Sequence, residues 1–356
     1  MQSANLFPPL APRKVAHFSL AGEYIFDIAK SSQYYAVSAS NHEIKLYHPQ
    51  TLNMLDTLRF HKDTISSIRI RNDHILISSS HDGSVVGHDL RAGYSPVFGM
   101  NAGMPVLSFD INCNDTLFCA GTELHNHDSN LLFWDPRNPS SLIGKFSESH
   151  SDDITQVQFH PYAPSKFLSG STDGLVCMYD IKVFDEDEEM TGVVNSGSSV
   201  SKTGWFGPAA EYVYCLTHIE TFSLSIADAA EDASNLLHDF GDIRALSNPG
   251  LLQVDYAIDC HYDESTQRLF LTTGSHSGDL SLLHVNLKSL QLCQNIQQAH
   301  SEVIRACHWE IPNHTLLTGG EDGKLCLWQP NQQSSTPPPL EHSTATVGKS
   351  RRHAPY

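Results

Sequence analysis

The sequence predicts an all-β protein in which similar four-stranded sheets follow one another around a ring. Three stretches, beginning at His61, His150 and His300, share one pattern: a histidine, then a serine or threonine, then Asp-Gly. The histidine and the aspartate are 21, 23 and 22 residues apart, and apolar and polar residues alternate between them. Such alternation indicates strands that are buried on one face. With weaker copies included, the aspartate positions are 41, 46, 45, 104 and 45 residues apart. A period near 45 with four short strands per unit is typical of a β-propeller.

The weaker copies complete the count of units. Asn41, Asp128 and Ser277 stand at the aspartate position of three further units. The interval of 104 residues holds one more unit and an insertion, and "EYVYCLTHIETFSLSIAD" (211–228) is the candidate for that unit. The sequence therefore predicts a seven-bladed propeller with a degenerate fifth blade.

Ring closure requires a strand from outside the last unit. After Trp328 the chain continues as "QPNQQSSTPPPLEHST", in which the prolines cannot donate hydrogen bonds to a sheet. The segment "KVAHFSLAG" (14–22) alternates correctly and belongs to no other unit. We expect it to supply the missing outer strand of the last blade and to cover the exposed sheet edge.

The expected domain organisation follows from this assignment. Residues 1–12 form an N-terminal extension and residues 13–330 form the propeller, with an acidic, flexible insertion at about 183–204. Residues 331–356 form a disordered tail that is rich in Pro and Ser and carries a short basic cluster, "GKSRRHAP" (348–355).

Histidine, serine and aspartate are also the side chains of a hydrolytic triad. A catalytic triad occurs once in a chain, whereas here the spacing recurs in three units. The recurrence favours a structural role, and no unique nucleophile or acid–base pair is apparent. We therefore predict a protein that is not an enzyme.

The spacing His…Ser/Thr…Asp…Trp, with endings such as "FWDPR" (133–137), resembles the WD40 family. The resemblance implies hydrogen-bonded chains of side chains inside the blades, because buried polar groups must be mutually satisfied. It implies a complete chain in the last unit. The implied members are His61, Ser78 and Asp82; His150, Ser169, Asp173 and Tyr179; His300, Thr318, Asp322 and Trp328; and Asp128 with Trp134.

Composition limits the partners. The formal net charge of −18 disfavours direct contact with nucleic acid and anionic lipid and favours basic peptides or domains. No 18-residue apolar run or secretory start is apparent, which predicts an intracellular protein without a membrane span. His125, His127 and Asp128 lack further ligands at suitable spacing, so we expect no metal and no cofactor.

Two sets of charged residues are candidate binding residues. An acid lies two residues after each of the three histidines, and by analogy with the family these acids line one face. This partner-binding set is Asp63, Asp152 and Glu302, with Glu321 in the adjoining turn and Arg305 close by. The alternatives are that each acid caps its own loop, and that Arg305 pairs with Glu302 or anchors a carboxylate.

The sequences "HDLR" (88–91) and "FWDPR" (133–137) end the third strand of two consecutive units with Asp-x-Arg. They resemble the box through which substrate receptors dock on the adaptor of the cullin-4 ubiquitin ligase. That resemblance would make Arg91 and Arg137 adaptor-binding residues, although His88 replaces the usual Trp in the first box.

From the first unit to the last, the chain is also similar to the WD repeat-containing protein 89 family. That resemblance implies a non-catalytic scaffold for protein–protein interaction and leaves the partner open. Together with the net charge of −18, it leads us to expect basic partners such as ribosome-assembly or nuclear proteins. We expect a monomer within a larger complex, located in the nucleus or cytoplasm, with the basic cluster favouring the nucleus. The alternative function is a ubiquitin-ligase substrate receptor.

Overall fold

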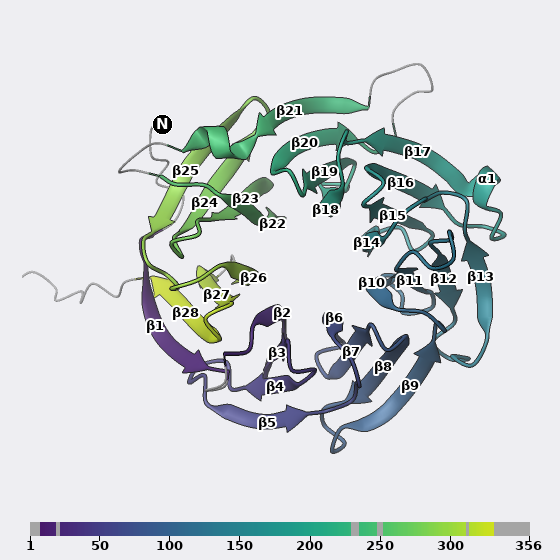
Figure 1. Ribbon diagram of the computed structural model, residues 1–356, viewed down its shortest axis with the longest axis horizontal. Helices are drawn as coiled ribbons and strands as arrows, with labels where there is room; N and C mark the ends of the chain where they lie inside the picture. Colours follow the sequence, from purple (N-terminus) through teal and green to yellow (C-terminus); the bar gives the residue numbers. More distant parts are fainter. Residues whose placement is uncertain (1–7, 19–21, 229–234, 248–251, 311–312, 331–356) are drawn as a thin grey trace, which may run out of the picture.

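The computed structural model describes residues 8–18, 22–228, 235–247, 252–310 and 313–330. These residues form seven antiparallel sheets of four strands, arranged radially around a central axis (Figure 1). The predicted seven-bladed all-β propeller is confirmed.

In each blade the chain runs outward from the axis, and consecutive strands pair. The strands of the first four blades are as follows. Blade 1 holds β2 (Ile25–Lys30), β3 (Tyr35–Ala39), β4 (Ile44–Tyr47) and β5 (Met54–Leu58); blade 2 holds β6 (Ile65–Arg71), β7 (Ile75–Ser80), β8 (Ser84–Asp89) and β9 (Ser95–Asn101); blade 3 holds β10 (Val106–Ile111), β11 (Phe118–Thr122), β12 (Leu131–Trp134) and β13 (Leu142–Phe146); blade 4 holds β14 (Ile154–Phe159), β15 (Lys166–Ser171), β16 (Leu175–Asp180) and β17 (Met190–Asn195).

The last three blades follow the same plan, and β1 completes the seventh. Blade 5 holds β18 (Val200–Phe206), β19 (Tyr212–Thr217), β20 (Thr221–Ile226) and β21 (Leu236–Asp242); blade 6 holds β22 (Tyr256–Asp263), β23 (Arg268–Gly274), β24 (Leu280–Asn286) and β25 (Ser289–Ile296); blade 7 holds β26 (Ile304–Glu310), β27 (Thr315–Gly320), β28 (Lys324–Pro330) and β1 (Leu10–His17).

The N-terminal strand closes the ring as predicted. Strand β1 pairs with β28 over its whole length, from Leu10 opposite Pro330 to His17 opposite Lys324. The strand begins at Leu10, four residues before the segment that the sequence suggested. Because the outer edge of β28 is thereby paired, blade 7 has four strands like the others.

The acidic segment is not the flexible insertion that we expected at 183–204. It contains the short helix α1 (Glu186–Glu189), all of β17 and most of β18. Two of its carboxylates accept hydrogen bonds from backbone N–H groups. Glu186 accepts them from residues 147–149, and Glu189 accepts them from residues 182–184. A carboxylate that accepts several N–H bonds orders a loop, and charge repulsion in the run is therefore offset.

The core consists of apolar layers between neighbouring blades. Phe133 of blade 3, for example, packs edge-on against Phe167 of blade 4, with ring centroids 5.6 Å apart. The Asp-Gly pairs form the turns between second and third strands, where Gly174 has a φ of +90° that other residues rarely adopt. The repeats therefore follow the hairpin chemistry that the sequence indicated.

One feature recurs in every blade without a clear sequence signal. Each innermost strand has a β-bulge near its start, as between Ile25 and Asp27 or between Ile304 and Ala306. Equivalent bulges occur in the other five blades. A bulge redirects the following side chains, and these side chains line the opening at the centre of the ring.

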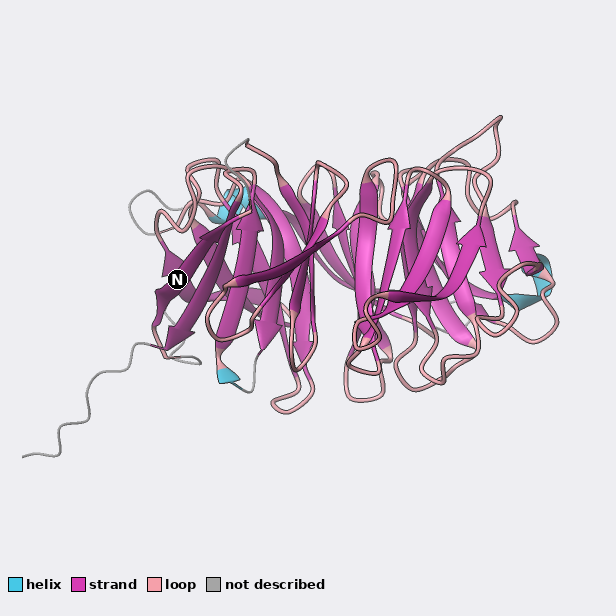
Figure 2. Cartoon of the chain, turned by 90° about the horizontal axis from the view of Figure 1, so that it is seen from below, coloured by secondary structure: helices cyan, strands magenta, loops and turns pink. Residues whose placement is uncertain are grey.

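The disc has two faces, because strands run through its thickness and loops emerge on both sides (Figure 2). The loops that precede the innermost strands, including residues 59–64, 147–153 and 297–303, define what we call the histidine face. The loops between first and second strands, including residues 160–165, 207–211 and 264–267, define the opposite face.

Candidate interaction surfaces

The complete side-chain chain of blade 7 is present. The imidazole of His300 lies 2.9 Å from Asp322 through Nδ1 and 2.8 Å from the Thr318 hydroxyl through Nε2. The indole Nε1 of Trp328 donates to the same hydroxyl at 2.9 Å. Because the carboxylate only accepts, we assign the proton to Nδ1, so that the Thr318 hydroxyl donates to Nε2. Each group in the chain is thereby satisfied.

Blade 4 has the same arrangement without the last hydrogen bond. His150 lies 2.7 Å from the Ser169 hydroxyl and 3.0 Å from Asp173. At the aromatic position, Tyr179 stacks on Phe167 with ring centroids 4.5 Å apart. The Tyr179 hydroxyl has no hydrogen-bond partner among the described residues, so the expected fourth member contributes by packing.

Blade 2 keeps the trio with a looser acid contact. His61 lies 2.7 Å from Ser78, but its Nδ1 is 3.3 Å from Asp82 and 3.0 Å from Ser84. His88 replaces the aromatic residue and stacks on Phe60, with centroids 3.5 Å apart. Burial lowers the pKa of His61 despite the opposing effect of Asp82, which favours the neutral imidazole that the hydroxyl contact requires.

These trios do not have the geometry of an active site. The hydroxyls of Ser78, Ser169 and Thr318 belong to residues with 0% exposure, so no substrate carbonyl can reach them. Each aspartate also accepts backbone N–H groups on both sides, as Asp322 does from Ser301 and Lys324. The trio thus joins the loop before a blade to a turn within it.

Blade 3 differs from the sequence-based assignment. Asp128 is exposed in the β11–β12 hairpin loop, where its backbone pairs with His125, and it forms no side-chain chain. Trp134 does occupy the aromatic position, opposite Phe118. The hydroxyl position holds Ala120, and the loop between β9 and β10 (102–105) contains no histidine. The two partners that a side-chain chain needs are therefore missing from this blade.

The acids that follow the histidines lie on the histidine face. Asp63 and Glu302 are exposed and Asp152 is partly exposed, in blades 2, 7 and 4 respectively. Asp63 and Asp152 each accept the N–H of the next residue, at 2.7 and 2.9 Å, as the loop-capping alternative proposes. The structure distributes the three carboxylates around the ring and does not gather them in one pocket.

Basic side chains on the histidine face are matched by other acids. Arg305 pairs with Glu321 through Nε at 2.7 Å, and not with Glu302. Arg59 pairs with Glu43, and Lys324 with Asp322 at 3.3 Å. The three acids of the partner-binding set therefore face solvent without these cations as counter-charges.

The two Asp-x-Arg boxes end third strands on the opposite face. Arg91 folds back on Asp89 with an Nη2–Oδ2 distance of 2.9 Å, and Arg137 does the same on Asp135 at 2.6 Å. Hydrogen bonds from each arginine lower the pKa of its aspartate to about 2. Their side chains remain 61% and 74% exposed.

A third Asp-x-Arg unit, which sequence analysis missed, tests how specific this geometry is. Arg244 folds back on Asp242 at 2.7 Å, immediately after the outer strand β21 of blade 5. This unit follows a fourth strand and so lies on the histidine face. Since the same local fold forms on both faces, the paired geometry alone does not indicate an adaptor site.

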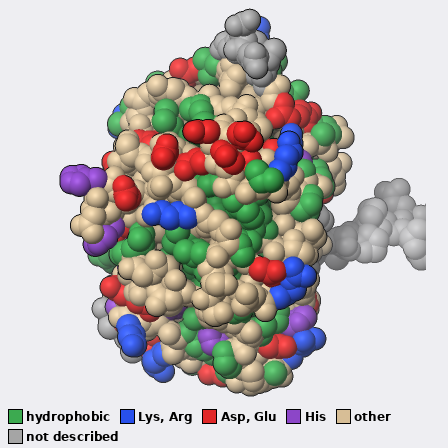
Figure 3. Space-filling view, turned by 90° about the vertical axis from the view of Figure 1, so that its right-hand side faces the viewer, with side chains coloured by type: hydrophobic (Ala, Val, Ile, Leu, Met, Phe, Trp, Pro, Cys, Tyr) green, Lys and Arg blue, Asp and Glu red, His purple; other side chains and the backbone are tan. Residues whose placement is uncertain are grey.

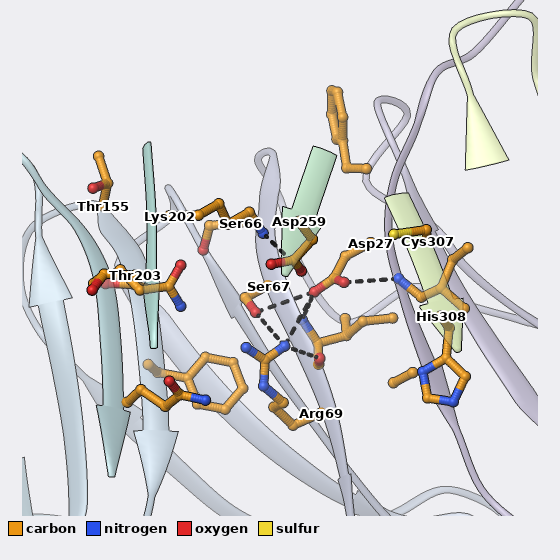
Figure 4. A pocket seen from close by; sticks show the side chains of 18 of the residues that line it. Asp27, Ser66, Ser67, Arg69, Thr155, Lys202, Thr203, Asp259, Cys307 and His308 are labelled. Carbon is orange, nitrogen blue, oxygen red and sulfur yellow. Dashed lines mark hydrogen bonds and ion pairs between the residues drawn. The ribbon is translucent and has the colours of Figure 1, made fainter. Parts of the chain in front are cut away.

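A cavity of about 590 Å³ occupies the centre of the ring and is lined by all seven innermost strands (Figure 4). Asp27 of blade 1 accepts the backbone N–H of Ile68 and lies 3.5 Å from Arg69, both in blade 2. Lys202 lies 3.9 Å from Asp259 in the next blade. The lining is polar, but these charges compensate each other, and the contacts join neighbouring blades.

A cysteine–histidine contact in this cavity has the wrong protonation for nucleophilic chemistry. His261 Nε2 lies 3.2 Å from Cys307 Sγ. Burial first, and then Asp259, raise the pKa of Cys307 well above that of a free thiol. Reactive cysteines require the reverse shift, so this pair does not resemble a catalytic dyad.

Carboxylates also gather on the rim of the disc at blades 3 and 4. Figure 3 shows acidic side chains beside an apolar area on this side. Exposed residues here include Asp185, Asp187 and Glu188 of the acidic run, and the exposed apolar residues Leu142 and Val183. The rim is thus a second acidic surface, separate from the histidine face.

In the described part of the chain no group of three or more His, Cys, Asp or Glu side chains is arranged to hold a metal ion. None of the helices among the described residues is both long enough and apolar enough to cross a membrane.

Comparison with known proteins places the chain among repeat proteins. The WD domain, G-beta repeat family matches residues 52–89, 140–180 and 291–329, which include parts of blades 1, 2, 3, 4, 6 and 7. A WD repeat-containing protein 89 homolog of Dictyostelium discoideum is 28% identical over 341 residues, covering 94% of this chain and 92% of that protein.

Two plant proteins extend the comparison. WD repeat-containing protein GTS1 of Arabidopsis thaliana is 30% identical over 368 residues, covering 95% of this chain and 91% of that protein. A ribosome biogenesis protein WDR12 homolog of Oryza sativa is 28% identical, but over only 34% of this chain and 27% of that protein. With its seven blades, its buried His–hydroxyl–Asp trios and these full-length relatives, the chain belongs to the WD40-repeat β-propeller family.

Proposed function

We propose that the protein is a non-catalytic scaffold that binds basic protein partners on its histidine face. The observation that carries this proposal is the position of Asp63, Asp152 and Glu302, which occupy the same loop in three blades. On a chain with a net charge of −18, such solvent-facing carboxylates attract cationic peptides and increase association rates. The buried trios and the protonated Cys307 thiol support the absence of catalysis.

The test compares neutralisation of two acidic surfaces. The variant with Asp63→Asn, Asp152→Asn and Glu302→Gln should lose binding of a Lys/Arg-rich peptide and of cross-linked cellular partners, and its residual binding should depend less on salt. The matched control, Asp185→Asn with Asp187→Asn and Glu188→Gln, removes the same charge from the rim. Equal loss in both variants, or no loss in either, contradicts a role for the histidine face.

The partner class that we propose includes ribosome-assembly and nuclear proteins. The rice relative is named as a ribosome biogenesis protein, although that similarity is confined to about a third of the chain. The nuclear preference rests on the cluster 348–355, which lies outside the described residues, as does the whole of the tail that we expected to be disordered. Co-sedimentation of the full chain with pre-ribosomal particles, lost in the histidine-face variant, is the expected result.

The second candidate function is a substrate receptor of a cullin-4 ubiquitin ligase. It is favoured by the exposure of Arg91 and Arg137 on the same face of adjacent blades. Arg91→Ala with Arg137→Ala should abolish co-purification of the ligase adaptor, while Arg244→Ala, which alters the same local geometry on the histidine face, should retain it. Retention of the adaptor by the double variant excludes this function.

A further inference from the structure

A cleft of about 310 Å³ opens beside the central cavity at the opposite face, and residues of blades 4, 5, 6 and 7 line it. It shares Gln158, Tyr214, Cys260 and His261 with the central cavity. Neither the histidine face nor the Asp-x-Arg boxes contribute to its lining.

Four of the aromatic residues that line the cleft occupy equivalent positions in the innermost strands. Counted from the bulge, one position near the end of each innermost strand holds Phe159, Trp205, Tyr262 and Trp309 in four consecutive blades. In blades 1 to 3 the same position holds Lys30, Ile70 and Ile111. We call the four rings the aromatic arc. Half of the chain's four tryptophans belong to it.

Two edges of the arc carry polar groups that are suited to a cation. Glu264 lines the cleft and accepts a hydrogen bond from the Tyr162 hydroxyl at 2.9 Å, which joins blade 6 to blade 4. The hydroxyl oxygen of Tyr262 is shielded from solvent and has no hydrogen-bond partner among the described residues. Burial first, and then Glu211, Glu264 and Asp263, raise the pKa of Tyr262, so negative potential reaches the cleft.

The histidines beside the cleft do not oppose a cation. Burial lowers the pKa values of His261 and His308, the latter to about 4, so both rings are neutral near pH 7. The two nearby indoles are also anchored: Trp205 donates to the Gln158 carbonyl at 3.2 Å, and Trp309 donates to Thr272 at 3.3 Å. The ring faces are therefore fixed before any ligand arrives.

We infer that the aromatic arc binds a cationic side chain, a lysine or an arginine presented by a protein partner. The apolar stem of either residue packs on the rings, and its charged head lies over a ring face and against Glu264. Desolvated cation–π contacts and a carboxylate partner together distinguish a cation from a neutral side chain of equal size. The inference rests on the proposed scaffold function only in that the ligand comes from a protein, and it places a second site on the other face of the disc.

The experiment uses the full chain and four capped peptides, Gly-Ser-X-Ser-Gly, in which X is arginine, lysine, trimethyllysine or the neutral citrulline. Fluorescence of Trp205 and Trp309, with calorimetry as a second readout, reports binding. We expect the peptide with the preferred cation to bind on the order of tenfold more tightly than the citrulline peptide. The order among the three cations tells whether lysine, its methylated form or arginine is the source.

Two variants complete the test. Glu264→Gln, at an exposed residue, should weaken binding of the peptide with the preferred cation on the order of tenfold and leave the melting temperature of the protein unchanged. The triple variant Asp63→Asn, Asp152→Asn, Glu302→Gln should leave peptide binding unchanged, so failure of the histidine face and failure of the cleft are distinguishable. Absence of binding at millimolar peptide, equal binding of citrulline, indifference to Glu264→Gln, or tighter binding of a single-stranded oligonucleotide overturns the inference.

Discussion

Replacement of His300 by alanine tests the physical role of the side-chain chains most directly. The imidazole is 3% exposed and makes two hydrogen bonds, one to the Asp322 carboxylate and one to the Thr318 hydroxyl. The substitution removes both bonds and leaves a polar cavity between a loop and a turn. Trp328 keeps its acceptor, because its bond goes to Thr318 and not to the imidazole.

The expected loss of stability can be worked out from these contacts. A hydrogen bond to a charged group contributes about 1.5–3 kcal/mol, and a neutral one about 0.5–1.5 kcal/mol. Asp322 keeps the amides of Ser301 and Lys324, so its carboxylate is not orphaned and the total stays near the middle of the range. We expect the free energy of unfolding to fall by about 3 kcal/mol.

That loss translates into a modest shift in melting temperature, because the protein is large. An unfolding entropy of about 2.1 cal/mol/K per residue, over about 300 folded residues, gives a shift of roughly 5 °C. Calorimetry measures the shift, and hydrogen exchange of the β26 and β27 amides locates it in blade 7. The control is His125→Ala in the exposed β11–β12 loop, which should change stability by less than about 0.5 kcal/mol.

Two results would refute the reasoning. An unchanged melting temperature for His300→Ala means that the buried hydrogen bonds are energetically balanced by desolvation of the same groups. An equal loss in His125→Ala means that the effect arises from replacing any histidine on this face. In either case the side-chain chain does not stabilise the blade, and the structural interpretation of the repeated trio fails.

Three further predictions concern acid stability, the acidic loop and ring closure. Burial opposes the charge on Asp82 and Asp173, but hydrogen bonds prevail and lower their pKa values, that of Asp82 to about 2. The stability that these carboxylates provide is therefore present above pH 4 and lost as the pH falls from about 4 to about 2. Over this range the urea midpoint of Asp82→Asn should decline less steeply than that of the parent chain. Glu189→Gln should speed hydrogen exchange of amides 182–184 at least tenfold, whereas the same change at exposed Glu188 should not. Deletion of residues 1–17 should leave the edge of β28 unpaired and cause aggregation that light scattering detects, and a monomeric deletion variant contradicts the closure mechanism.

The fold was predictable because the features that specify it repeat. Histidine, hydroxyl and Asp-Gly recur at nearly fixed spacing, so three strong copies established the period and the weaker copies could be placed by counting. The closing strand was predictable for a related reason: the last unit ends in prolines, and one alternating segment was left over. Closing a ring of sheets requires that each edge be paired.

The errors arose where local composition and tertiary contacts disagree. The run Asp185–Glu189 repels itself and favours a flexible loop, but Glu186 and Glu189 accept backbone hydrogen bonds that only the folded chain supplies. Asp128 has the expected spacing to Trp134. However, the loop of the β11–β12 hairpin is longer than its counterparts in the other blades, and Asp128 is exposed within this loop. Spacing alone does not distinguish a longer hairpin from a shared motif.

The candidate sites were predictable only in part, because the aromatic arc depends on residues that break the repeat. The aromatic arc becomes visible once the bulge fixes the register of each innermost strand, since Phe159, Trp205, Tyr262 and Trp309 are far apart in the chain. Arg244 was missed because it follows an outer strand, where no such box was expected.

The division between buried and exposed polar residues separates the two roles of the chain. Residues that recur, such as His300, Thr318 and Asp322, are buried and satisfy one another, so they leave nothing for a partner to contact. Charged residues of the loops are instead exposed to solvent, as Glu264 is at the mouth of the cleft and Glu302 is on the histidine face. Local rules are broken at functional sites more often than elsewhere. The partner of this propeller is therefore expected to contact exposed carboxylates such as those of Glu264 and Glu302, whose neutralisation should weaken binding without preventing folding.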